Sequence, residues 1–247
     1  MSSVKHRISQ NFLRSPQIAL MLVGHSNIRK RDFTLDIGAG SGVFTYALSK
    51  KSAQVLAIEF DRETFKKLQN NTKKLENVEV LCVDFLRFNL SKLPKNYKVC
   101  ANIPFHLSSP IIQKLTNAQN SPKSIYLILQ KQFARKLIVS DKNFTSALGV
   151  KIFPFFESKI KKPLQKSDFT PPPAVETVFF EMKRRETPLI SKEEHPIFND
   201  FIEKMFAVPE FYKKNCQPKF KTKKPSELKG EEWLEIWRFW QNSDKIE

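Results

Sequence analysis

The sequence predicts an α/β protein: a parallel sheet with helices on both faces, followed by a small helical C-terminal domain. Three observations predict this fold. Strand-like apolar runs alternate with helical patterns between residues 33 and 131, as in βαβ units. Three closely spaced glycines follow the first of these runs, at a strand-to-helix turn. Beyond Pro188 only helical patterns remain.

The elements are expected in the following order. Ser15-Pro16 predicts the start of a helix that ends near Gly24. Parallel strands are predicted at Phe33–Ile37, Gln54–Glu59, Val78–Val83, Lys98–Ala101 and Ser124–Gln130, with helices between them that include Val43–Leu48, Arg62–Asn71 and Pro110–Leu115. Antiparallel strands closing the sheet edge are predicted at Leu148–Phe156, Glu157–Leu164 and Val175–Met182. Lys183-Arg184-Arg185 indicates a linker, so the expected domains are 1–182 and 183–247, the second with helices at Pro196–Ala207 and Glu231–Trp240.

The chain is strongly basic. Its 247 residues carry 42 Lys and Arg against 25 Asp and Glu, a formal net charge of +17. Residues 183–247 hold nearly equal numbers of both signs, so almost all of the excess lies in residues 1–182. This excess favours a polyanionic partner, most simply nucleic acid. A membrane surface is the rival partner, but no basic amphipathic helix with an anchor motif is evident.

Composition also indicates a reduced, cytoplasmic protein without a metal. The cysteines, Cys82, Cys100 and Cys216, are odd in number and widely separated, and they form neither a disulfide framework nor a zinc pattern. The polar start lacks the apolar segment of a signal peptide. No apolar run approaches the roughly 20 residues that a membrane helix requires, so we expect no membrane contact.

The first candidate site is the glycine loop. Half of the six glycines lie at Gly38, Gly40 and Gly42, where positive φ and close ligand approach are available. Glu59 ends the next predicted strand, and an acid there can accept hydrogen bonds from both ribose hydroxyls of an adenosine cofactor. Asp84-Phe85, at the third strand end, can accept from the adenine amino group and pack on its ring. At this point NAD and S-adenosylmethionine both remain open.

The second candidate site is Asn102-Ile103-Pro104-Phe105, at the fourth strand end. The side-chain oxygen of Asn102 and the carbonyl of Ile103 can both accept from an exocyclic amino group. Pro104 stiffens the turn, and Phe105 offers a stacking face. Such a cluster suits a planar base that has been extruded from its stack.

With these residues the sequence resembles the rRNA adenine N6-dimethyltransferases, the Erm and KsgA-type enzymes. The resemblance covers residues 1–182 in family order. The matching stretches are Gln10-Asn11-Phe12-Leu13, Asp36-Ile37-Gly38-Ala39-Gly40-Ser41-Gly42, Glu59, Asp84, Asn102-Ile103-Pro104-Phe105 and Phe169-Thr170-Pro171-Pro172-Pro173-Ala174-Val175. Any one of them is weak, whereas the set is highly specific.

The resemblance implies a Rossmann-like methyltransferase sheet, S-adenosylmethionine as cofactor and no metal. Asn102 to Phe105 would be catalytic, and Phe105 and Phe169 would stack on the flipped target base. Phe105 stands where many relatives carry Tyr, which preserves stacking and loses a hydroxyl. The cofactor would be bound by Asn11, Leu13, Gly38, Gly40, Glu59, Phe60, Asp84, Phe85 and Asn102.

Within the family, Ser9-Gln10-Asn11-Phe12, Ile103 and the short helical tail are more similar to Erm. Erm proteins dimethylate one adenine of 23S rRNA and confer macrolide, lincosamide and streptogramin B resistance. We therefore expect a monomer that acts on 23S rRNA in a protein-free or partly assembled state.

Three alternatives remain. A KsgA-type enzyme would act on 16S rRNA, and a non-catalytic relative would only bind nucleic acid. An NAD oxidoreductase would explain the glycine loop and Glu59 and leave Asn102 to Phe105 unexplained.

Overall fold

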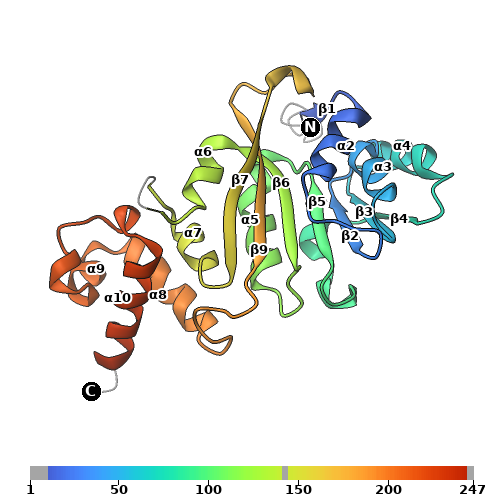
Figure 1. The fold of residues 1–247 in the computed structure, drawn as a ribbon. Helices are drawn as coiled ribbons and strands as arrows, with labels where there is room; N and C mark the ends of the chain where they lie inside the picture. The colour runs from blue at the N-terminus through green and yellow to red at the C-terminus, as the bar shows by residue number, and fades with distance from the viewer. Residues whose placement is uncertain (1–10, 141–143, 244–247) are drawn as a thin grey trace. The chain divides into compact units, whose positions relative to one another are not determined.

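The computed structural model describes residues 11–140 and 144–243 (Figure 1). Its contacts divide the chain into two compact units. Unit 1 comprises Met1–Lys131 with Lys159–Arg184, and unit 2 comprises Gln132–Ser158 with Arg185–Glu247. This division differs from the expected 1–182 and 183–247, because the segment 132–158 packs with the C-terminal helices. The predicted domain assignment therefore stays a prediction.

A seven-stranded sheet of order β4-β3-β2-β5-β6-β9-β7 forms the centre of the fold. Its first five strands in that order run parallel, and β9 pairs antiparallel with β6. The predicted α/β class is confirmed, and seven of the eight predicted strands agree to within two residues at each end. The bounds are β2 Phe33–Ile37, β3 Gln54–Glu59, β4 Val78–Cys82, β5 Lys98–Ala101, β6 Ser124–Gln130, β7 Phe156–Leu164 and β9 Thr177–Arg184.

The register of the parallel strands brings their carboxyl ends together. Ile37 at the end of β2 is opposite Ile58, one residue before the end of β3. On its other side β2 pairs with β5, with Leu35 opposite Val99. The loops that leave β2, β3 and β5 therefore emerge side by side, which is where ligands bind in open α/β sheets.

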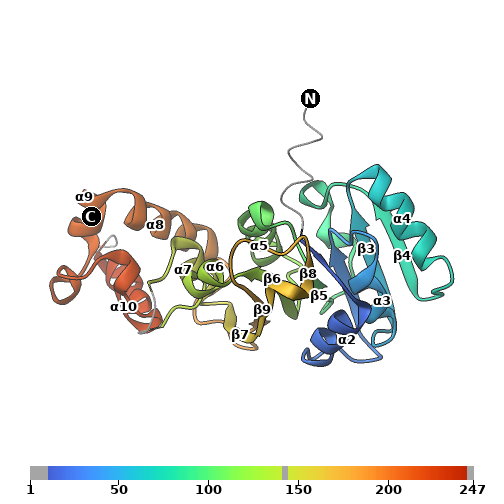
Figure 2. The ribbon, with the colours of Figure 1, turned by 90° about the horizontal axis from the view of Figure 1, so that it is seen from above.

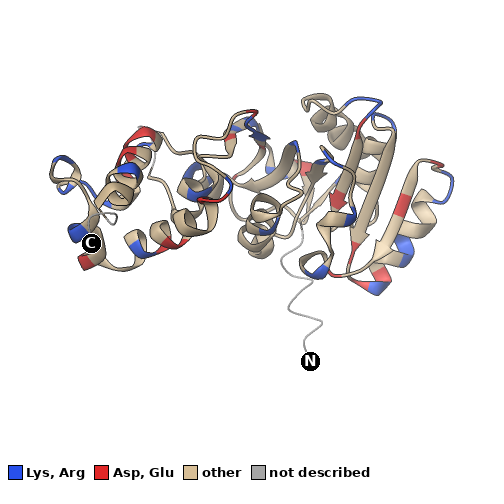
Figure 3. Cartoon of the chain, turned by 90° about the horizontal axis from the view of Figure 1, so that it is seen from below, with Lys and Arg blue, Asp and Glu red and all other residues tan. Residues whose placement is uncertain are grey.

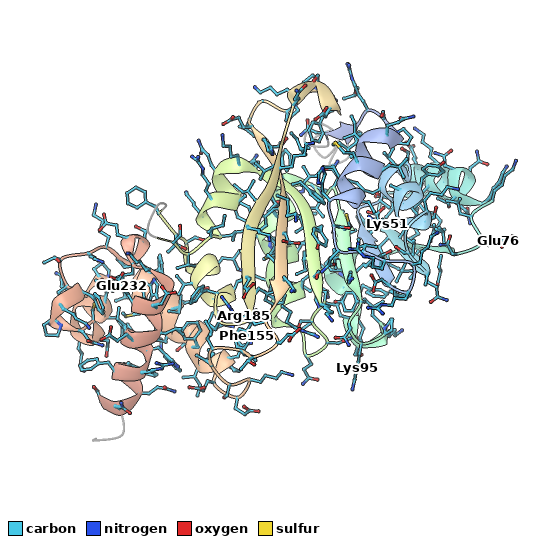
Figure 4. The ribbon with its side chains drawn as sticks, in the orientation of Figure 1. Lys51, Glu76, Lys95, Phe155, Arg185 and Glu232 are labelled. Carbon is cyan, nitrogen blue, oxygen red and sulfur yellow. The ribbon has the colours of Figure 1, made fainter. Side chains whose placement is uncertain are left out.

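Helices cover both faces of this sheet. The helices α2 (Pro16–Gly24) and α3 (Val43–Ser49) lie on one face, and α5 (Ser108–Asn117) lies on the other (Figure 2). The helix α4 (Arg62–Thr72) packs against β3 and β4 through Leu68. Lys51, labelled in Figure 4, donates through Nζ to the carbonyls of Val23 (3.2 Å) and Gly24 (3.4 Å), where α2 ends.

A separate two-stranded sheet joins distant parts of unit 1. Its strands are β1 (Phe12–Leu13) and β8 (Phe169–Thr170), and they pair antiparallel. Leu13 and Phe169 belong to the apolar core that also holds residues of α2 and α3. The short 3₁₀ helices of unit 1 are η1 Phe85–Arg87, η2 Leu90–Lys92, η3 Phe105–Leu107 and η4 Lys166–Asp168.

Unit 2 is built largely from helices around an aromatic core. Trp237 is fully buried against Phe198 and Phe201, with ring centroids 5.2 and 5.3 Å away. The backbone N–H of Arg185 donates to the Phe155 carbonyl (2.8 Å), both labelled in Figure 4. The helices of unit 2 are α6 Lys131–Lys136, α7 Ala147–Ile152, α8 His195–Ala207, α9 Pro209–Asn215 and α10 Gly230–Ser243, with the 3₁₀ helices η5 Pro218–Phe220 and η6 Pro225–Glu227.

One predicted strand is wrong. Leu148–Phe156 was expected to be extended, but Ala147–Ile152 is the helix α7. Short apolar runs do not distinguish a buried helix from a strand, and most of this helix is buried. The decisive local signal is Ser146, whose Oγ accepts from the Gly149 backbone N–H (3.2 Å) as an N-cap. The helix α9 was not predicted at all.

Lysine and arginine residues are spread over many elements of the chain rather than gathered on one (Figure 3). Within the described residues, no helix is long and apolar enough to cross a membrane.

Candidate active site

The glycine loop connects β2 to α3 through left-handed backbone. Gly38, Gly40 and Gly42 have φ values of 64°, 60° and 97°, which side-chain-bearing residues rarely adopt. A Cβ on Gly40 would lie 3.3 Å from the Phe12 ring, and one on Gly38 would lie 3.5 Å from Pro104. The loop therefore packs closely against β1 and against the turn that follows β5.

Glu59 fixes the shape of this loop from the end of β3. Its side chain is buried, and Oε2 accepts from the Gly40 N–H at 2.9 Å. Its other oxygen, Oε1, accepts from the Asp61 N–H at 2.9 Å. A carboxylate oxygen has a second lone pair, so both oxygens can still accept from ribose hydroxyls.

Asp36 belongs to a stretch that matches the family, but the sequence analysis assigns it no role in the site. It is fully buried in β2, and its Oδ2 accepts from the Thr45 hydroxyl at 2.7 Å. Its Oδ1 has no hydrogen-bond partner among the described residues. Burial raises the pKa of Asp36 to about 7, the Thr45 bond opposes that rise, and the charge of Glu59 adds to it. An acid in the middle of an apolar strand is the signal that could have found it.

The turn after β5 carries Asn102, Ile103 and Pro104. The Asn102 side chain donates through Nδ2 to the Asn11 carbonyl at 2.7 Å. Ile103 is buried, and the Pro104 carbonyl accepts from the Leu107 N–H at 2.9 Å, which starts η3. None of the hydrogen bonds found within 11–140 and 144–243 occupies Oδ1 of Asn102.

These elements enclose one cleft with an empty volume of about 530 Å³, its open mouth included. Eight predicted site residues line it: Asn11, Leu13, Gly38, Gly40, Glu59, Asn102, Ile103 and Pro104. Six further residues were not on the predicted list: Phe12, Asp36, Ala39, Ser41, Val43 and Phe44. The structure thus brings the two candidate sites of the sequence together.

The other predicted site residues do not line this cleft. Phe60 is 71% exposed, and Phe85 is buried with Lys114 Nζ 5.7 Å from its ring centroid. Asp84 accepts from the Leu86 N–H at 2.8 Å and so caps η1. Their predicted contacts with adenine stay predictions.

The two predicted stacking residues differ in exposure. Phe105 is half-buried and packs against the apolar core. Phe169 is 0% exposed within that core, so it presents no ring face to a base in this structure. The stacking roles that the resemblance implies for Phe105 and Phe169 stay predictions.

The cleft suits an adenosine cofactor that carries positive charge. The glycine loop leaves room for close approach, and Glu59 offers acceptors for a ribose. Oδ1 of buried Asp36 has no hydrogen-bond partner among the described residues, and a bound donor or cation would stabilise it, because a buried acceptor without a partner costs free energy. No cluster of three or more potential metal ligands occurs among the described residues.

A glycine loop, a strand-end acid and an Asn-Ile-Pro turn on such a sheet define an S-adenosylmethionine-dependent methyltransferase. The model of the family described as ribosomal RNA adenine dimethylase matches residues 1–225. The chain belongs to this family and is an S-adenosylmethionine-dependent rRNA adenine methyltransferase.

Relatives with curated names support this membership. The rRNA adenine N-6-methyltransferase of Staphylococcus aureus is 33% identical over 196 residues, covering 79% of this chain and 78% of that protein. The ribosomal RNA small subunit methyltransferase A of Mycoplasmopsis synoviae is 34% identical over 193 residues, covering 77% of this chain and 73% of its own length.

Solved structures agree in fold. The 23S rRNA methyltransferase ErmE is 22% identical with a TM-score of 0.78, and the match covers 94% of this chain and all of ErmE. A dimethyladenosine transferase from Plasmodium falciparum is 20% identical with a TM-score of 0.75, covering 94% and 98% of the two chains.

Proposed function

We propose that this protein dimethylates N6 of one adenine in 23S rRNA and thereby confers macrolide, lincosamide and streptogramin B resistance. The observation that carries the chemistry is one shared cleft. Asn102, Ile103 and Pro104 line the same space as the glycine loop and Glu59. The cofactor's side and the acceptor's side of a transfer reaction are thus adjacent.

The proposed chemistry is positioning rather than covalent catalysis. S-adenosylmethionine, when bound, supplies an electrophilic methyl group on its sulfonium. Oδ1 of Asn102 and the carbonyl of Ile103 accept the two N6 hydrogens of the target adenine. These bonds would draw the hydrogens out of the ring plane and localise the nitrogen lone pair toward the methyl group. As the carbon–nitrogen bond forms, the carbon–sulfur bond of the sulfonium would break to leave a neutral thioether, and N6 would release one proton to water.

Phe105 holds the extruded base by stacking, which is worth roughly 1–3 kcal/mol per base. Glu59 accepts from the ribose of the cofactor, and Gly38 and Gly40 let the backbone approach it. Leu13 and the backbone at Asn11 border the same space. Phe60 and Asp84-Phe85 remain proposed contacts of the adenine moiety.

The choice of 23S rRNA rests on Ser9-Gln10-Asn11-Phe12 and on Ile103. Ser9 and Gln10 lie outside the residues that the structure describes. A second candidate is 16S rRNA. It is favoured by the names of several relatives, among them the small subunit methyltransferase A of Bacillus pumilus, which is 30% identical over 214 residues. Both targets require the same chemistry at N6.

Primer extension in a macrolide-sensitive host that expresses this chain decides between them, because dimethyladenine blocks reverse transcriptase. The proposal expects one new stop in 23S rRNA and growth on a macrolide. Stops confined to 16S rRNA would instead assign the small-subunit activity. A host carrying the Asn102→Ala variant is the matched control.

The proposed substrate is protein-free or partly assembled rRNA, bound in the cytoplasm by a monomer. The positive charge of residues 1–182 supports this, since phosphate contacts make binding fall steeply with salt. Extruding a base is least costly from single-stranded or loop RNA.

A further inference from the structure

The two-stranded sheet β1–β8 holds the N-terminal segment against the cleft. Phe12 pairs with Thr170, and Leu13 pairs with Phe169. Just beyond β1, the Arg14 N–H donates to the Asp168 carbonyl and its Nε donates to the Thr170 hydroxyl, both at 2.9 Å. We call residues 12–14 and 168–170 the β1–β8 clip.

Phe12 and Leu13 of this clip, and Asn11 just before it, border the cleft. The Asn11 carbonyl accepts the Asn102 side chain, the Phe12 ring lies over Gly40, and Leu13 lines the wall. The segment is therefore a wall of the active site that comes from far away in the sequence.

The contact to Asn102 decides how its amide is oriented. A backbone carbonyl has no hydrogen to donate, so the amide end that faces it is the NH₂ group. The Nδ2–oxygen distance of 2.7 Å fixes that end. Oδ1 is then the end that remains to accept a hydrogen from the target.

Phe169 packs as the buried anchor of the clip. It is 0% exposed, and it shares the apolar core with Leu13, its partner across the sheet. Stacking on a flipped base would require the ring to leave this core, with loss of the packing that holds β1 in register.

We propose that the β1–β8 clip is a positioning element, with Phe169 as its anchor, that holds the Asn11 carbonyl where it orients the catalytic amide of Asn102. This rests on the proposed role of Asn102 in methyl transfer. Loosening the clip lets the amide rotate, which lowers the rate of transfer more than the affinity for RNA.

The test compares Phe169→Leu with Phe179→Leu. Phe179 is also 0% exposed in the same apolar core, but it lies in β9 and stacks on Tyr126 with centroids 5.7 Å apart. The two variants lose the same atoms from one core, so a merely structural role predicts the same result for both.

Two readouts are followed. In steady-state assays, we expect Phe169→Leu to lower kcat by about tenfold or more, since a misplacement of about 1 Å can cost a hundredfold. The KM of Phe169→Leu for RNA should be similar to the KM of Phe179→Leu. In ¹⁵N-asparagine NMR, the Asn102 Nδ2 signal, assigned by its loss in Asn102→Asp, should lose protection from solvent exchange in Phe169→Leu alone.

A rise in KM for RNA with a protected Asn102 amide would overturn the proposal and restore a stacking role. Equal effects in both Phe→Leu variants would also overturn it. Should Phe169→Leu fold poorly, Thr170→Val removes only the Arg14 Nε bond and should expose the same amide more mildly. The NMR readout needs no RNA, so absence of rRNA methylation by the wild type would refute the proposed function and leave the clip's contact measurable.

Discussion

The two sides of the cleft are built in different ways. The cofactor side is assembled from neighbouring parts of the chain: Thr45 bonds Asp36 from 9 residues away, and Glu59 bonds Gly40 from 19. The target side is assembled from distant parts. Asn102 contacts the carbonyl of Asn11, 91 residues away, and that segment is held by residues 156 positions further along.

This difference separates what each side depends on. The cofactor side needs one βαβ unit, whose loop conformation is set by glycines and by the carboxylate of Glu59. The target side needs the whole of unit 1 to be folded before Asn102 is oriented. We therefore expect damage to the first side to appear in cofactor affinity and damage to the second to appear in the transfer rate.

The largest expected effect is on the target side. Replacing Asn102 by Ala removes the proposed acceptor of the N6 hydrogens, so methyl transfer should fall at least about a hundredfold, as when a positioned hydrogen-bonding group is lost elsewhere. Cofactor affinity by calorimetry should remain nearly intact. A variant that still dimethylates rRNA at the wild-type rate would remove Asn102 from the mechanism.

The next effect is on the cofactor side. Glu59→Gln keeps one acceptor oxygen but loses the charge and one of the two bonds that organise the loop. The Kd for S-adenosylmethionine should rise about tenfold to a hundredfold, as expected for hydrogen bonds to a charged group. At saturating cofactor, kcat should stay close to that of the wild type. A fall in kcat alone would mean that the two sides are not separable in this way.

The same difference explains what could be predicted from the sequence. Gly38, Gly40 and Glu59 were found because a local pattern of strand, glycines and strand-end acid has a fixed geometry. The clip was not found, because nothing near Asn11 in the sequence indicates β8 as its partner. The burial of Phe169 could not be predicted for the same reason, because it depends on contacts that only the folded chain makes.

Helix and strand assignment followed the same rule. The strands of the parallel sheet are predicted well because each is a short, mostly apolar run between turn signals. The strand predicted at Leu148–Phe156 is wrong, since the apolar residues of this run show no period that distinguishes a helix from a strand. The packing of this helix in unit 2, where Gly149 lies close to the Lys136 carbonyl, depends on tertiary contacts that the local sequence does not show.

Asp36 provides a smaller, pH-dependent test of the cofactor side. With a pKa of about 7, the carboxyl group of Asp36 is protonated below that pH in the cofactor-free protein. A cationic cofactor should displace this proton when it binds. The affinity for the cofactor should therefore rise about tenfold per pH unit up to pH 7 and then level off. Asp36→Asn should flatten this profile in calorimetry across pH 5.5 to 8.5, values spanning about 1.5 units on each side of that pKa.

The free protein should show the opposite trend. Because the folded pKa of Asp36 exceeds its unfolded value of 3.8, its contribution to stability is fully present below that value and is lost as pH rises through about 7. Asp36→Asn should therefore stabilise the cofactor-free protein most at pH 8, measured by urea unfolding. An unchanged pH profile in both assays would assign the titration to another group.

The smallest effect distinguishes the backbone of Asn11 from its side chain. The bond from Asn102 is accepted by the Asn11 carbonyl, which Asn11→Ala retains. With cofactor saturating, kcat should stay within about twofold of the wild type, the size of change common for a half-exposed side chain. If the Asn11 side chain contacts the cofactor, Asn11→Ala should instead raise the KM for S-adenosylmethionine. A large loss of kcat in Asn11→Ala, with the Asn102 amide still protected, would show that the side chain acts on the target directly, and the target side would then include a second amide.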